Sequence, residues 1–459
     1  MYLRRDKSIV CTLIKIILIA ILCMYILFLT GTDITQKTIS LLVVCSSALS
    51  VLYLLLNKNI VNGGLFFVVY LYTLFVHNGF VIAYFFEESY ATFQSVTSMA
   101  FLKNAFYSKA IVLSNLVIIV FILSSNLITK HDLRKADLSD CIDIPYDGDK
   151  VADYICIPVL FLGTAYIGAI SIIYNLMFAR YSYVLSVTEN MGLYHHVTVI
   201  LALTVALLFS VGTDKGIKIG LSIFIVTTFI HFSIGNRGEV LYSAAVCLAL
   251  YQLRYRKISK KIMGLIAAAA VILIPLVRIV RSGQFDIYTF NPLNSLLETL
   301  AELGIQISPV TYIVDYVQNG HGHVWGLTYL NDFMIFIQNH LFISNPLNVT
   351  ANNIKQIMPY DGMGFSMIGE LYYNFTIVGA VLFYIVYGLF LRSLDKKIME
   401  NGLTLTKRIV YSMLMVEFVN LTRNDASTLP LYIAYTIVLL VAYKMGSSLR
   451  NRKSYSSLG

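Results

Sequence analysis

The chain has 459 residues, of which 58% are hydrophobic and only 13% are charged, and its mean hydropathy is +0.73. These values differ strongly from those of soluble globular proteins, so the sequence predicts an integral membrane protein. The net charge of +9 does not indicate nucleic-acid binding, because the basic residues lie between apolar runs and no basic patch is interleaved with aromatic residues.

A membrane-spanning helix needs roughly 20 mostly apolar residues, and the sequence contains about twelve such runs. The expected fold class is therefore an all-α polytopic membrane protein. The first run lacks the cleavage site of a secretory signal, so we expect it to remain as a membrane anchor of a chain that starts at Met1. The predicted spans are 9–30, 38–56, 65–86, 106–128, 154–178, 195–211, 218–234, 240–253, 262–280, 366–391, 408–421 and 426–445.

The positions of lysine and arginine predict the orientation of these spans. If both termini face the cytoplasm, most of the 34 basic residues fall in cytoplasmic loops, as the positive-inside rule requires. The longest connection, 281–365, then lies on the outer face. The predicted organisation is 1–280 with about nine spans, 281–365 as a large external loop, and 366–459 with about three spans and a basic cytoplasmic tail.

Two stretches of the external loop have the period of an amphipathic helix. The first, NPLNSLLETLAELG, has Asn291 as its N-cap, Pro292 at the first helical position and Gly304 as its terminator. The second is 329–343. Such helices lie in the membrane interface and can roof a cavity, or they pack as ordinary helices. The predicted apolar faces consist of Leu293, Leu296, Leu297, Leu300 and Leu303 in the first and of Leu330, Phe333, Met334, Ile337 and Leu341 in the second.

Ionisable residues gather where the predicted spans reach the outer face, and charge at membrane depth usually serves a function. The turn IGNRGEV carries Arg237 and Glu239, the stretch VRIVRSGQ carries Arg278 and Arg281 on one helix face, and TRND carries Arg423. Because a guanidinium matches phosphate oxygens and stays charged, these arginines are candidates for binding an anionic group, with Glu239 holding Arg237 in place. The alternative is that a turn arginine is only an interfacial anchor.

The stretch GFSMIGELYYNF carries a second polar group of residues. Ser366, Glu370 and Asn374 are spaced by four, so they share one helix face, with Tyr372 and Tyr373 beside it. A carboxylate at this depth can act as a general base, bind a sugar hydroxyl or pair with the arginines. A plain Arg–Glu pair that neutralises itself is the alternative interpretation.

The stretch HGHVW in the external loop contains His321, His323 and Trp325. Two imidazoles two residues apart are a weak metal signal, so no metal site is predicted, and a general base, a sugar-stacking site or an ordinary loop remain open. His77, Asn78 and the His195–His196 pair are expected to be polar groups that pack helices together. The six cysteines form no zinc or disulfide pattern, and without a nucleotide-binding motif no cofactor is expected.

These motifs resemble the Wzy-type polymerases of O-antigen and related bacterial polysaccharides. The resemblance rests on GNRGE after a middle span, VRIVRSGQ at the start of the external loop, GFSMIGELYYNFTIVG at the start of the next span, and the late TRND. It implies a GT-C-like layout and an inverting glycosyltransferase at the periplasmic face of the bacterial inner membrane. Its substrates would be undecaprenyl-pyrophosphate-linked oligosaccharides, and a chain-length regulator would be a partner.

The same resemblance implies roles for individual residues. Fixed arginines can stabilise a departing pyrophosphate without a metal. The pyrophosphate-binding residues would be Arg237, Arg278, Arg281 and Arg423, and Glu370 or a loop histidine, His321 or His323, would activate the acceptor hydroxyl. The neighbouring Glu239, Tyr372 and Asn374 complete the predicted substrate site.

Three other functions remain open from the sequence. An O-antigen ligase would use the same donor in a similar layout, but the RGE and GELYYNF motifs favour a polymerase. A flippase or secondary transporter of lipid-linked oligosaccharides usually has internal repeats and broken helices at mid-membrane, and no repeat is visible here. An assembly scaffold without activity is disfavoured by the group of arginines.

Overall fold

The computed structural model describes most of the chain but leaves several connections out. The described residues are 2–57, 60, 64–87, 99–125, 127, 148–177, 179, 181–189, 191–234, 247, 292–341, 357–358, 366–401, 405–424 and 426–456. The predicted spans 240–253 and 262–280 and the residues Asn291, Arg237, Glu239, Arg278 and Arg281 lie outside the described residues.

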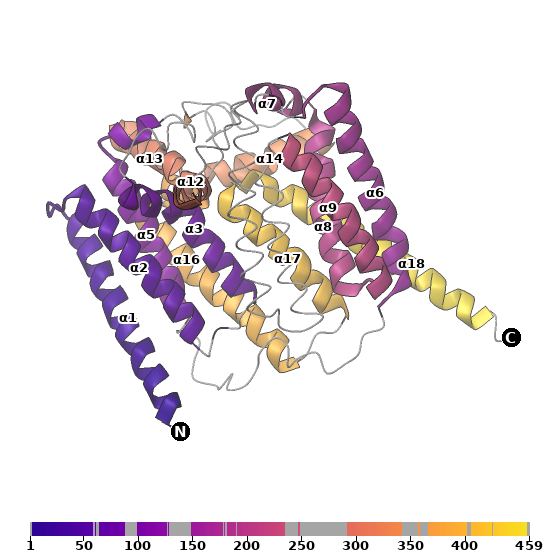
Figure 1. Cartoon of the computed structure of the whole chain (residues 1–459), viewed down its shortest axis with the longest axis horizontal. Helices are drawn as coiled ribbons and strands as arrows, with labels where there is room; N and C mark the ends of the chain where they lie inside the picture. Colours follow the sequence, from indigo (N-terminus) through magenta and orange to yellow (C-terminus); the bar gives the residue numbers. More distant parts are fainter. Residues whose placement is uncertain are drawn as a thin grey trace. The chain divides into compact units, whose positions relative to one another are not determined.

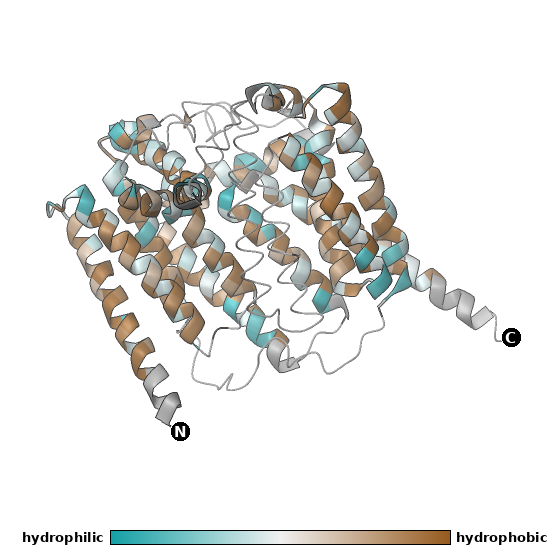
Figure 2. Cartoon of the chain, viewed as in Figure 1, coloured by the Kyte–Doolittle hydropathy of each residue, from teal (hydrophilic) through white to brown (hydrophobic). Residues whose placement is uncertain are grey.

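The described part of the chain is helical and contains no strand, which confirms an all-α membrane protein. Nine of its helices are long and apolar enough to cross a membrane, so the chain is a multi-pass membrane protein. Figure 2 shows apolar residues along most of the length of α1 (Tyr2–Leu29) and α2 (Gln36–Leu56). The predicted span 408–421 forms a helix, α17 (Leu405–Arg423), that is not among these nine.

The chain forms two compact units, each built from separate segments. The first, unit 1, consists of Met1–Asp137, Asn291–Glu400 and Val419–Thr428, and the second, unit 2, consists of Leu138–Phe290, Asn401–Phe418 and Leu429–Gly459. Unit 1 therefore contains the N-terminal end of the chain and unit 2 the C-terminal end, and each unit is built from three segments that are separate in the sequence.

Unit 1 contains the four N-terminal helices α1, α2, α3 (Leu65–Phe86) and α5 (Tyr107–Ser124), which pack against one another (Figure 1). A buried network joins them: Asn78 donates to Ser47 at 2.9 Å and to Asn115 at 3.0 Å, and Asn115 donates to Tyr25 and Ser46, each at 2.7 Å. Because lipid offers no alternative partners, these amides hold the helices together. The predicted packing role of Asn78 is thus confirmed.

The first predicted amphipathic helix exists as α12 (Pro292–Leu303), and it packs against α3, as Figure 1 shows with α12 seen end-on. The contact needs glycine on both sides. A Cβ on Gly304 would lie 1.8 Å from the backbone nitrogen of Phe80, and one on Gly79 would lie 2.5 Å from the carbonyl oxygen of Leu300. The predicted leucine face is buried only in part, because Leu297 is buried while Leu296 is exposed.

Gly304 ends α12 as predicted, but the chain continues into the 3-10 turn η4 (Gly304–Gln306) and a further helix, α13 (Ile307–Tyr316). The π turn η5 (Val317–His321) follows. The second predicted amphipathic helix is α14 (Leu327–Leu341). Its apolar face is partly exposed, because Leu330 and Phe333 are each about half exposed while Met334 and Ile337 are half-buried. A short 3-10 helix, η1 (Met99–Lys103), packs on α13 and α5.

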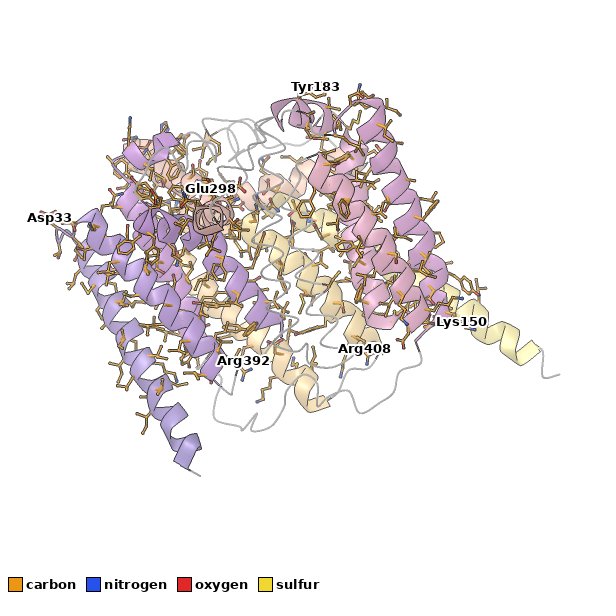
Figure 3. The ribbon with its side chains drawn as sticks, viewed as in Figure 1. Asp33, Lys150, Tyr183, Glu298, Arg392 and Arg408 are labelled. Carbon is orange, nitrogen blue, oxygen red and sulfur yellow. The ribbon has the colours of Figure 1, made fainter. Side chains whose placement is uncertain are left out.

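The long helix α16 (Met367–Asn401) runs through unit 1 and extends beyond the predicted span 366–391. Asp395 near its end accepts the backbone amides of Leu65 at 2.9 Å and Phe66 at 3.1 Å, so a carboxylate from one helix caps the N-terminus of α3. The buried Arg392 interacts electrostatically with Asp395. Figure 3 shows Arg392 toward the opposite end of α3 from Glu298 on α12.

Unit 2 contains α6 (Lys150–Ile173), α7 (Tyr181–Glu189), α8 (Gly192–Val211), α9 (Asp214–Ser233) and α18 (Leu429–Ser456). Thr164 and Thr227 share a 2.6 Å hydrogen bond between α6 and α9. Asp149 caps α6 and also accepts the hydroxyl of Tyr443 at 2.7 Å, which ties α18 to the start of α6. In Figure 3, Lys150 and Tyr183 lie toward opposite ends of this unit.

Candidate functional site

The first two turns of α16 form the centre of the candidate site in unit 1. Ser366, Glu370 and Asn374 are all buried, with exposed fractions of 0%, 1% and 0%. As predicted, the four-residue spacing places them along one side of the start of the helix. Each of them forms a hydrogen bond with a residue outside α16. Buried polar side chains need such partners, because an unsatisfied group inside the protein is costly.

Glu370 connects three segments through its two carboxylate oxygens. Its Oε1 accepts the hydroxyl of Thr328 on α14 at 2.8 Å, and its Oε2 accepts the backbone amide of Ala426 at 3.0 Å. Ala426 begins the turn η7 (Ala426–Thr428). Two donors on different segments hold the buried carboxylate in a fixed orientation. Glu370 therefore fixes the positions of α14 and η7 around the start of α16.

Asn374 extends this network to the loop before α14. Its Nδ2 donates to Thr328 Oγ1 at 2.6 Å and to the carbonyl of Glu370 at 2.9 Å, and its Oδ1 accepts the backbone amide of Gly326 at 2.9 Å. The side chain uses both its donor and its acceptor groups, which is what a buried amide requires. The loop and the helix are thereby held together.

Backbone strain is concentrated on both sides of this contact. α16 has non-helical dihedral angles at Phe375 and Thr376, and Thr376 has φ 65°. Opposite it, Trp325 has φ 52°, and its backbone amide donates to the carbonyl of Asn374 at 3.0 Å. The kink makes this hydrogen bond possible, because a carbonyl inside a regular helix would accept a bond from its own helix. Positive φ in side-chain-bearing residues is typical of functional sites.

His323 lies in the same loop, 321–326, with one ring nitrogen fixed. Its Nδ1 lies 2.9 Å from the carbonyl oxygen of Tyr372 and 3.2 Å from that of Tyr373. Carbonyls only accept, so Nδ1 carries a proton, and Nε2 is the nitrogen that has the free electron pair in the neutral ring. The ring is half-buried and contacts the ring of Tyr372 edge-on at 5.3 Å between centroids.

His321 has a different environment although it is only two residues away. Its exposed ring stacks flat on Tyr316, with 3.9 Å between centroids and 5° between planes. Tyr316 in turn contacts Tyr373 edge-on at 6.0 Å. The two histidines therefore do not converge on one point, and within the described ranges no three His, Cys, Asp or Glu residues are grouped as metal ligands would be.

Two tyrosines stiffen the surroundings of the site. The hydroxyl of Tyr372 accepts a hydrogen bond from Gln318 at 3.1 Å, and Gln318 also accepts one from Lys109 at 2.8 Å. Burial raises the pKa of Tyr329 on α14, and the negative charge of Glu370 raises it further, so Tyr329 stays protonated. Its ring stacks with Phe375 at the kink of α16.

His77 on α3 is attached to the beginning of α16. Its Nδ1 lies 3.0 Å from the carbonyl of Thr73, so this nitrogen carries the proton, and Nε2 accepts the hydroxyl of Ser366 at 2.8 Å. Ser366 Oγ also accepts the amide of Gly369 at 3.3 Å, as an N-cap does. This confirms a packing role for His77 and shows what it holds.

Arg423, at the end of α17, is half-buried and hydrogen-bonds the side chain of Tyr72 on α3.

Of the predicted site residues, the structure brings together Glu370, His323, Tyr372 and Asn374, whereas His321 stacks on Tyr316. Sequence reasoning missed Thr328, whose hydroxyl joins Glu370 and Asn374. A lone threonine at the start of a predicted helix carries no signal of that role.

Comparisons with known proteins place the chain in a family. The family model described as "O-antigen polysaccharide polymerase Wzy" matches residues 10–453. The chain is also similar to "Protein CapE" of Staphylococcus aureus, with 26% identity over 352 residues, which cover 75% of this chain and 76% of that protein. No solved structure matches. Because the family model covers nearly the whole chain, this protein belongs to the O-antigen polysaccharide polymerase Wzy family.

Proposed function

We propose that this protein is an inverting glycosyltransferase that polymerises lipid-linked oligosaccharide repeat units. Family membership makes it a polysaccharide polymerase. The finer proposal is that the donor is a glycan on undecaprenyl pyrophosphate and the acceptor is the non-reducing end of a second lipid-linked unit. The reaction would take place at the periplasmic face of the inner membrane, with both termini in the cytoplasm and a chain-length regulator as partner.

In this reaction an acceptor hydroxyl attacks the anomeric carbon of the donor glycan. The new C–O bond forms as the bond to the pyrophosphate oxygen breaks, the pyrophosphate leaves with the electron pair, and a base takes the hydroxyl proton. The protein must therefore supply a positioned base and positive charge for the leaving group.

The observation that carries the choice of base is the fixed tautomer of His323. With Nδ1 bound to two carbonyls, Nε2 is an acceptor in a half-buried loop beside the polar start of α16. Glu370 was the other candidate, but both of its oxygens already accept hydrogen bonds. We assign His323 as the general base and Glu370, with Asn374, as residues that position its loop. The ring of Tyr372 contacts that of His323 edge-on.

The positive charge is assigned to the arginines of the family-like motifs. Arg237, Arg278 and Arg281, with Glu239 as the partner of Arg237, would bind the pyrophosphate together with Arg423. Their guanidinium groups suit this role because they form bidentate hydrogen bonds with phosphate oxygens and remain charged in a dry site.

The function is tested in a host that lacks the gene and carries Arg237→Ala or Arg237→Lys, with protein levels measured by blot. We expect the polysaccharide ladder on a gel to collapse to a single repeat unit in both variants, because lysine cannot form the bidentate contact. An unchanged ladder would make Arg237 an interfacial anchor. Loss of every band that carries a repeat unit would indicate an O-antigen ligase or a flippase instead.

A further inference from the structure

Trp325 is the most exposed residue of the candidate site that bears a large apolar ring. Its side chain is 72% exposed, and it is the single tryptophan of the chain. Tryptophan has a strong tendency to be buried, so an exposed indole next to a polar site needs an explanation.

The backbone that presents this indole is held rigidly. Trp325 is one of three non-glycine residues with positive φ in the described ranges. The amides of Val324 and Trp325 donate to the carbonyls of Tyr373 and Asn374 at 3.2 and 3.0 Å, and the next amide, of Gly326, donates to the Asn374 side chain. A strained backbone persists only when its surroundings fix it. The backbone of α16 therefore fixes the position from which the indole projects.

The neighbours of Trp325 are polar groups and aromatic edges. The ring of His323 lies 6.4 Å away between centroids, at 62° to the indole plane. Of the two glycines in the loop, Gly322 has no atom within 4 Å of where a Cβ would lie, whereas a Cβ on Gly326 would contact the ring of Phe375 at 3.4 Å. An open aromatic face beside hydrogen-bonding groups matches a pyranose ring, whose axial C–H groups pack on the face while its hydroxyls bind at the edge.

We propose that Trp325 is a carbohydrate platform that binds one pyranose ring of the acceptor glycan and sets its orientation toward His323. This inference rests on the proposed function, because it assigns the sugar to the polymerase site. The competing role is an interfacial anchor, since tryptophan is enriched at membrane surfaces. A membrane anchor would not need a turn that has a positive φ and is fixed by backbone hydrogen bonds to α16. The structure therefore favours sugar binding over anchoring.

Because Trp325 is the single tryptophan, the intrinsic tryptophan fluorescence of the whole chain reports this residue alone. The purified chain in lipid vesicles is titrated with the free repeat-unit oligosaccharide released from the host's own polysaccharide, and with maltotetraose as the control sugar. We expect a saturable change in emission with the host oligosaccharide and none with the control. No change up to the solubility limit of the host oligosaccharide would overturn the proposal.

A second measurement separates a sugar platform from a membrane anchor. In vesicles made with dibromo-phosphatidylcholine, an indole in the lipid is quenched by bromine, whereas one held over the site is not. We expect emission close to that in unbrominated lipid. Strong quenching by the brominated lipid, without a response to sugar, would assign Trp325 to the membrane interface.

The kinetic test uses Trp325→Leu and Trp325→Phe, with Phe333→Leu as a matched control because Phe333 is also exposed. For Trp325→Leu we expect KM for the acceptor to rise about tenfold with little change in kcat, as loss of one aromatic contact implies. Trp325→Phe should recover most of the affinity, and Phe333→Leu should match wild type.

Equal KM values for wild type and the three variants would overturn the proposal. If wild-type protein does not polymerise at all, the proposed function fails, while the fluorescence titration still decides whether Trp325 binds sugar.

Discussion

The side-chain amide of Asn374 donates to the hydroxyl of Thr328 across 2.6 Å, although the two residues are 46 positions apart in the chain. The same hydroxyl donates to Glu370 at 2.8 Å. Buried networks of this kind are sensitive to every member, because removing one leaves the others without partners. These hydrogen bonds therefore hold the start of α16 and the beginning of α14 together, and the position of the loop that carries His323 depends on them.

Replacing Glu370 with Gln should destabilise the protein and reduce polymerisation. A carboxylate accepts from both Thr328 and Ala426, whereas an amide turns one of these contacts into a donor facing a donor. The expected loss of stability is about 1–3 kcal/mol, measured by thermal unfolding of the purified protein. Glu87→Gln, at the half-buried end of α3, serves as the control and should behave as wild type. Full stability and a normal polysaccharide ladder for Glu370→Gln would remove Glu370 from the network.

Replacing Ser366 with Ala should loosen the beginning of α16. The hydroxyl caps the amide of Gly369 and donates to His77, so its removal exposes an orphan amide and leaves a buried imidazole nitrogen unpaired. We expect a loss of about 1–2 kcal/mol. Ser393→Ala on the same helix removes only a hydroxyl that bonds its own helix and should be nearly neutral. Equal unfolding temperatures for the two variants would contradict the role of the His77 contact.

Replacing Gly304 with Ala should separate α12 from α3. The added Cβ would meet the backbone of Phe80 at 1.8 Å, a clash that side-chain motion cannot relieve. We expect about 3 kcal/mol of destabilisation or a poorly folded protein. Gly192→Ala is the matched control, because a Cβ there meets no atom within 4 Å. A stable Gly304→Ala protein would mean that α12 does not rest on α3 in the membrane.

Replacing Asp395 with Asn should destabilise unit 1 at the end far from the candidate site. Asp395 caps α3 and opposes the charge of the buried Arg392, so the substitution leaves a buried cation without its partner. Removing one member of such a pair costs about 3–5 kcal/mol. The double variant with Arg392→Met should recover part of the stability, and Asp33→Asn in the exposed turn after α1 should have no effect. A double variant less stable than Asp395→Asn would contradict the charge argument.

Much of the fold was readable from the sequence because membrane spans need long apolar runs. The helices α1, α2, α3 and α5 begin and end within a few residues of the predicted spans 9–30, 38–56, 65–86 and 106–128, apart from the polar first turns of α1. The helix α13 was not predicted, because it is short and buried at most positions and so lacks the apolar period of a surface helix.

Only those features of the candidate site that depend on neighbouring residues in the sequence could be predicted. The four-residue spacing of Ser366, Glu370 and Asn374 predicted a shared helix face, since spacing along one helix is a local property. Their partners His77, Thr328 and Ala426 were not predicted, because contacts between distant segments leave no periodic signal. Likewise, the pattern HGHVW gave no sign that His323 and His321 have different environments, which depends on the carbonyls and rings that each one meets.

The most direct test of the account is polymerisation by the purified chain in proteoliposomes that contain undecaprenyl-pyrophosphate-linked repeat units as donor and acceptor. Wild-type protein should form a ladder of repeat-unit multiples and release one undecaprenyl pyrophosphate per bond. His323→Asn, whose amide nitrogen can replace the Nδ1 donor but supplies no base, should slow this reaction by about 10²-fold or more at nearly unchanged stability. His321→Asn should keep most of the rate. A His323→Asn protein as fast as wild type, or wild-type protein that forms no ladder, would contradict the account.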